Sequence, residues 1–145
     1  MGEAIIRYFH FFGIILFSSA LFIQLFLISG NVSAEQIRRI ARSDTMAGMS
    51  IFVVIISGLL LWLMVGKPSA YYSSNWIFYL KLFTLFLIIL LAIKPAVFFA
   101  RNRRRTDSVI EIPRRVIRQI RAEVALLLMM PMFAVFMARG YGVIL

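Results

Sequence analysis

Four long apolar runs alternate with shorter polar connections along the chain. The runs cover residues 4–28, 46–65, 76–99 and 122–138. A helix needs about 20 apolar residues to cross ~30 Å of hydrocarbon, so the first three runs are long enough. The fourth is short and contains Pro131, but Glu123 and Arg139 at its ends can reach toward the interfaces. The pattern predicts an all-α fold, an antiparallel four-helix transmembrane bundle in which residues 1–145 form a single domain.

The composition supports a membrane protein. Hydrophobic residues make up 62% of the chain, against about 45–50% in soluble domains, so lipid must cover part of the apolar surface. Cysteine is absent and His10 is the only histidine. These counts exclude disulfides, thiolate metal sites, zinc sites built from several imidazoles, and bis-histidine haem ligation within one chain.

The basic residues predict the orientation. Residues 29–45 and 100–121, which join the first to the second run and the third to the fourth, must lie on the same side of the membrane. By the positive-inside rule this side is cytoplasmic and both termini lie outside, as in a multi-pass protein of the bacterial inner (plasma) membrane. No aromatic residue is interleaved among the arginines, so we expect anionic lipid headgroups as their partners and no nucleic acid. The arginines of the two connections are Arg38, Arg39, Arg42, Arg101, Arg103, Arg104, Arg105, Arg114, Arg115, Arg118 and Arg121.

Two ionisable residues lie inside the apolar runs, where function is the default explanation. His10 is six residues into the first run and Lys81 is five residues into the third, counted from the same side. At ~1.5 Å per residue both lie roughly 8–9 Å below the outer boundary. Each shares a helical stripe with the small and polar residues of its run, including Gln24 in the first. The pattern predicts a pocket between the first and third spans.

Two interpretations of this pair stay open. Imidazole is a good axial ligand for haem iron, and one histidine suffices for a five-coordinate haem. The Lys81 ammonium could then pair with a propionate, supply a sixth ligand, or move protons. The simpler interpretation is that His10 hydrogen-bonds a backbone carbonyl or water, and that Lys81 extends to the nearby interface.

A second group of charged residues lies near the cytoplasmic ends of the runs, namely Asp44, Lys94, Arg101 and Glu123. A proton path is one interpretation, and ion pairs that lock the bundle are the favoured one. Asp44 is also predicted to be the helix N-cap before Thr45.

The sequence resembles a bacterial family of four-helix inner-membrane proteins with no assigned function. The resemblance covers nearly the whole chain and includes YFHFFG at 8–13, ARSD at 41–44, WIFYLKL at 76–82 and MARG at 137–140. More distantly, the chain resembles the HemJ type of protoporphyrinogen oxidase and the CopD-like membrane proteins. These share a small size, a four-helix core, a histidine in the first span and a lysine early in the third. In HemJ-like proteins the histidine binds haem b and the lysine is needed for activity.

The resemblance implies that His10 binds haem iron and that Lys81 is the catalytic companion in a HemJ-like membrane redox protein, with porphyrinogen oxidation as the reaction. The alternative is a non-enzymatic accessory or assembly subunit of a larger membrane complex, or a homo-oligomer, because catalytic groups are nearly absent. A transporter or channel is disfavoured, since few polar residues lie between His10 and Glu123 along the expected bundle.

Overall fold

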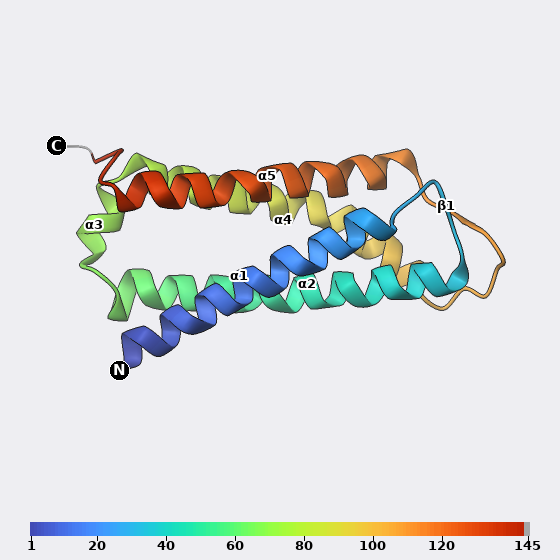
Figure 1. The fold of residues 1–145 in the computed structure, drawn as a ribbon, viewed down its shortest axis with the longest axis horizontal. Helices are drawn as coiled ribbons and strands as arrows, with labels where there is room; N and C mark the ends of the chain where they lie inside the picture. Colours follow the sequence, from blue (N-terminus) through green and yellow to red (C-terminus); the bar gives the residue numbers. More distant parts are fainter. Residues whose placement is uncertain (144–145) are drawn as a thin grey trace.

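The computed structural model describes residues 1–143, and within them four long helices form a bundle (Figure 1). Each helix is long and apolar enough to cross a membrane, so the predicted all-α membrane bundle is confirmed. The helices and strands are α1 (Gly2–Leu27), β1 (Asn31–Val32), α2 (Ala34–Leu60), the π-helical turn η1 (Leu61–Val65), α3 (Ser69–Ser73), α4 (Trp76–Asn102), β2 (Ile110–Glu111) and α5 (Arg114–Ala138).

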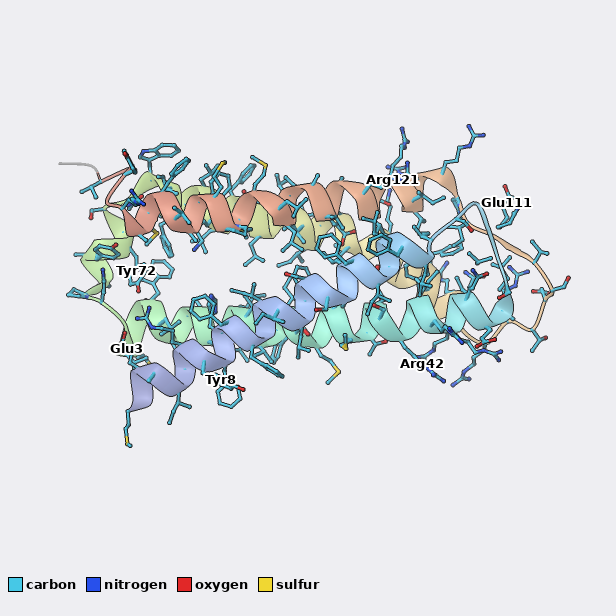
Figure 2. The ribbon with its side chains drawn as sticks, in the orientation of Figure 1. Glu3, Tyr8, Arg42, Tyr72, Glu111 and Arg121 are labelled. Carbon is cyan, nitrogen blue, oxygen red and sulfur yellow. The ribbon has the colours of Figure 1, made fainter. Side chains whose placement is uncertain are left out.

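The two ends of the bundle differ. The N-terminus, α3 and the end of α5 lie together at what we call the terminal end, and the α1–α2 and α4–α5 connections lie at the opposite, basic end (Figure 1). Arg42 and Arg121 are near the basic end, whereas Glu3 and Tyr72 are at the terminal end (Figure 2). Both connections therefore share one side of the bundle, as the sequence required.

Helix α2 starts much earlier than the apolar run it contains. Ser33 is its N-cap: Gln36 N donates to Ser33 Oγ at 3.2 Å, and Ser33 N donates to Gln36 Oε1 at 2.9 Å. This capping box satisfies the free N–H groups of the first turn, so the helix runs unbroken through Asp44. The prediction that Asp44 is an N-cap was wrong.

A small apolar core closes the basic end. β1 pairs antiparallel with β2, with Val32 opposite Ile110, and Ile112 N donates to Gly30 O at 2.9 Å. The buried side chains beside this pair come from both connections and three helices: Val32, Ile37, Ile40, Ala41, Phe99, Ile110, Ile112, Val116 and Ile120. The two-stranded pairing was not predicted, and it ties the α1–α2 connection to the α4–α5 connection.

Asn75 joins the terminal ends of α4 and α5. Its Oδ1 accepts from Ile77 N at 2.9 Å, and its Nδ2 donates to Tyr141 O at 2.9 Å. Gly142 follows with φ +83°, and a Cβ there would lie 2.7 Å from Asn75 Oδ1 and from Ile77 Cγ1. Glycine is required by both the backbone and the space. The fourth apolar run is thus the last part of a 25-residue helix whose end is anchored to α4.

The helices pack as two pairs, α1 with α2 and α4 with α5; α1 also contacts α5, and α2 also contacts α4. The middle of the bundle is filled by Phe17, Ala20, Leu21, Ala47, Ile88, Val124 and Leu127. Large apolar side chains point outward as well: Phe26 is 82% exposed and Phe52 is 65% exposed. Such a surface needs lipid around it.

Candidate functional site around His10

His10 points from α1 toward α2. Its Nδ1 lies 3.1 Å from Val54 O and 3.0 Å from Ser57 Oγ. Ser57 uses its single proton on Val53 O, at 2.6 Å. The Val54 carbonyl can only accept a hydrogen bond. The Ser57 hydroxyl has already donated its proton, so it too can only accept from His10. Both contacts therefore require that the ring proton is on Nδ1.

In the neutral imidazole the other ring nitrogen, Nε2, is therefore an acceptor. No hydrogen bond to Nε2 occurs among residues 1–143, and the His10 side chain is only partly buried. A fixed Nδ1–H and a free Nε2 lone pair are the arrangement that metal-binding histidines use, because the second hydrogen bond sets the tautomer and the ring orientation.

Two glycines bring α1 and α2 close together at this point. A Cβ on Gly13, one turn after His10, would lie 2.9 Å from Val54 Cγ2 and 3.4 Å from Ser50 O. A Cβ on Gly58 would lie 3.2 Å from His10 Cε1. Small residues at such positions let helix backbones approach in a membrane. The hydrogen bonds of His10 to α2 depend on this spacing.

Lys81 lies on α4 and is partly buried. Its charge is near enough to act on the His10 imidazole, yet no hydrogen bond or ion pair of Lys81 occurs in the described residues. α1 packs on α2 and α5, whereas α4 packs on α5 and α2. The structure thus places His10 and Lys81 in the same half of the bundle without a hydrogen bond between them, and the pocket between their helices stays a prediction.

Trp62 was missed by the sequence reasoning. It lies in η1, which packs against α1, and its ring meets Phe78 edge-on with centroids 4.9 Å apart. Its buried Nε1 has no hydrogen-bond partner. A tryptophan at the end of an apolar run is typical of an interface, so nothing in the sequence marked this one as an inward-facing donor.

A buried polar layer lies nearer the basic end. Gln24 and Glu123 are 1% and 2% exposed, Gln24 lies close to the Asp44 carboxyl, and the charge of Asp44 acts on Glu123. Gln24 Nε2 and Glu123 Oε1 have no hydrogen-bond partner. Three helices therefore meet at an amide and two carboxyl groups.

The prediction that ion pairs lock the bundle in this layer was wrong. Lys94 and Arg101 are exposed on α4, and neither pairs with Asp44 or Glu123. Long cationic side chains extend toward the interface, while the shorter acidic ones stay where their helical stripe puts them. The ion pairs within residues 1–143 are Glu3–Arg7, Glu35–Arg39 and Arg105–Asp107.

The chemistry available to the site is limited. Residues 1–143 contain no group of three or more His, Cys, Asp or Glu side chains that could hold a metal ion. His10 alone could serve a metal whose other ligands come from a porphyrin. Two cavities, of about 520 and 440 Å³, lie along α4 and α5, and neither is lined by His10 or Lys81.

Comparison with known proteins identifies a family model that covers nearly the whole chain. Residues 2–142 match the family model described as predicted membrane protein (DUF2214). No curated protein and no solved structure matches the chain. The match extends over α1 to α5, so both His10 and Lys81 fall within it.

Proposed function

The chain belongs to this family of predicted membrane proteins, and we propose that it is a haem b-binding membrane redox protein in which His10 is the axial ligand of the iron. The observation that supports the proposal is the fixed Nδ1–H of His10, which leaves the Nε2 lone pair available. A porphyrin supplies four nitrogen ligands itself, so the lack of a larger ligand cluster is compatible with this cofactor.

Haem, when bound, supplies one-electron redox chemistry. The residues of the chain would bind and orient it. Val54 O and Ser57 Oγ hold the imidazole plane, and Gly13 and Gly58 set the distance of that plane from α2. Lys81 has no ion-pair partner in the described residues, so its ammonium is available to a propionate in the same half of the bundle. Oxidation of a porphyrinogen is the reaction that the sequence resemblance implies.

The test is an absorption spectrum of the protein purified from haem-supplied membranes. We expect a Soret band that His10→Ala abolishes. Ser57→Ala should keep the band but change the reduction potential, because it alters the hydrogen bond on Nδ1 and leaves the ligand in place. A wild-type protein without a Soret band after haem reconstitution, or unchanged haem content in His10→Ala, would overturn the proposal.

A second candidate is a non-enzymatic accessory subunit of a larger membrane complex, or a homo-oligomer. The observation that favours it is the set of large apolar side chains on the outside of the bundle, such as Phe26 and Phe52, which the helices of a partner could cover. It predicts co-purification with a partner protein, or a stable oligomer, in mild detergent. A monodisperse monomer that binds haem would count against it.

We also propose that the basic end is cytoplasmic in the bacterial inner membrane, in contact with anionic headgroups. The segregated arginines support this orientation. Because the chain has no cysteine, single substitutions report position cleanly. A membrane-impermeant maleimide should label Ser69→Cys in intact spheroplasts and Ser108→Cys only after lysis. The reverse pattern would invert the orientation.

A further inference from the structure

A cavity of about 520 Å³ lies between α4 and α5 near the basic end of the bundle. Ile93, Val97 and Phe98 form much of its apolar wall, and Lys94, Arg101 and Arg115 supply three positive charges. No acidic residue lines it. The cavity therefore combines an apolar wall with a cationic one.

The cations of this cavity are not neutralised by the protein. The ion pairs among residues 1–143 involve Arg7, Arg39 and Arg105, so Lys94, Arg101 and Arg115 are without an acidic partner in the described part of the chain. Three like charges around one cavity repel each other, and an anion between them would relieve that repulsion.

The lining residues of α4 lie at successive depths in the membrane, with Ile93 and Lys94 deepest, Val97 and Phe98 next, and Arg101 near the interface. Lys94, Val97, Phe98 and Arg101 share a stripe of α4 by their i, i+3, i+4, i+7 spacing. Lys94 and Arg101 are about 10 Å apart along the helix at ~1.5 Å per residue. Arg101 lies in the last turn of α4, and Arg115 lies in the first turn of α5. These two side chains flank the end of the cavity that faces the interface, and Ile93 lies at the deeper end.

From this arrangement we propose that the cavity binds a single anionic diacyl phospholipid of the phosphatidylglycerol type. Arg101 and Arg115 bind the phosphate, and the acyl chains lie along Ile93 and Val97. Lys94 extends toward the phosphate from the side of the membrane interior. Basic pockets between transmembrane helices on the cytoplasmic side bind anionic lipid headgroups in other membrane proteins. The site does not depend on haem binding by His10, since it needs only α4 and α5 in a bilayer.

Charge gives the reason to choose phosphatidylglycerol. Its headgroup carries only the negative charge of the phosphate, whereas the choline ammonium of phosphatidylcholine would be repelled by Lys94, Arg101 and Arg115.

The test is native mass spectrometry of the detergent-purified full chain with added phosphatidylglycerol or phosphatidylcholine. We expect one tightly retained phosphatidylglycerol and at least tenfold weaker retention of phosphatidylcholine. The triple variant Lys94→Gln, Arg101→Gln, Arg115→Gln should lose this preference. Val97→Trp fills the apolar part of the cavity and keeps all three charges, so it should also release the lipid.

The matched control removes the same charge from the same end of the protein. Arg103, Arg104 and Arg118 do not line the cavity, so their triple replacement by Gln should keep the retained lipid. Equal loss in both triple variants would show general charge attraction and overturn the site, as would a wild type that retains neither lipid preferentially. Competition by glycerol 3-phosphate as effective as the whole lipid would overturn the role of the acyl chains.

Discussion

Replacing Gly13 with alanine tests how closely α1 and α2 must approach for the His10 site to form. The new Cβ would lie 2.9 Å from Val54 Cγ2 and 3.3 Å from Val53 Cγ1. Carbon atoms prefer a separation of about 3.5–4.0 Å, so the shortest contact lacks roughly 0.6–1.1 Å. Valine side chains in helices are held near one rotamer, and the third neighbour, Ser50 O, belongs to the backbone. The two helices must therefore separate.

The expected cost follows from these contacts. Extra methyl groups in a packed interior cost about 1–3 kcal/mol, while glycine to alanine inside a helix gains roughly 0.5–1 kcal/mol. Gly48→Ala on α2 is the matched control because a Cβ there meets nothing within 4 Å. It should receive the helix gain alone. The difference in unfolding free energy between the two variants should be about 1–3 kcal/mol.

Gly13→Ala should also weaken the hydrogen bonds of His10 to α2. Its Nδ1 contacts of 3.0 and 3.1 Å leave little room, since a hydrogen bond weakens beyond about 3.2 Å. His10 is the only histidine, so ¹⁵N-histidine labelling gives one imidazole to observe by NMR.

We expect the Nδ1–H tautomer in the wild type and in Gly48→Ala, and a mixture of tautomers in Gly13→Ala. Unfolding in detergent is measured alongside. Equal stability of Gly13→Ala and Gly48→Ala, with unchanged imidazole signals, would refute the close-approach argument.

Three further predictions concern stability in detergent. Glu123→Gln should leave the unfolding free energy unchanged or raise it, because the buried Glu123 carboxyl has no cationic partner to lose; a strong destabilisation would reveal a bound cation. Asn75→Ala should lower it by about 1–3 kcal/mol, since two buried hydrogen bonds are lost, and proteolysis should reach the segment after α5 faster; an unchanged cleavage rate would contradict the anchoring role. Ser33→Ala should lower the unfolding free energy by about 0.5–2 kcal/mol, and Ser29→Ala, outside the helix, serves as the control. Equal effects of the two changes would show that the capping box does not stabilise α2.

The general architecture was predictable because lipid imposes it. A chain in hydrocarbon must satisfy its backbone internally, so apolar runs of the observed length can only become helices. The start of α2 at the Ser33 capping box and the start of α5 after Pro113 also depend on local sequence alone.

The candidate site was predictable only in part. Position in the apolar runs identified His10 and Lys81, and helical periodicity put His10 and Gln24 on one face. The partner of that face was not predictable, because periodicity says which residues face inward but not which helix they meet. The α1–α2 pairing, which gives His10 its two hydrogen bonds, follows from close contact at Gly13 and Gly58.

Asp44 shows the same limit in a charged residue. Its place before an apolar run suggested a helix start, and Lys94 and Arg101 suggested partners. Because α2 begins at the Ser33 capping box, Asp44 lies in the interior of the helix. The long side chains of Lys94 and Arg101 are exposed and do not pair with it.

The sequence by itself therefore determined that this protein has four membrane helices with their charges collected at one end, because burial in lipid depends on each segment alone. The tertiary structure decided which buried polar groups meet, which remain unpartnered, and where the cavities lie, because these depend on contacts between segments distant in the chain.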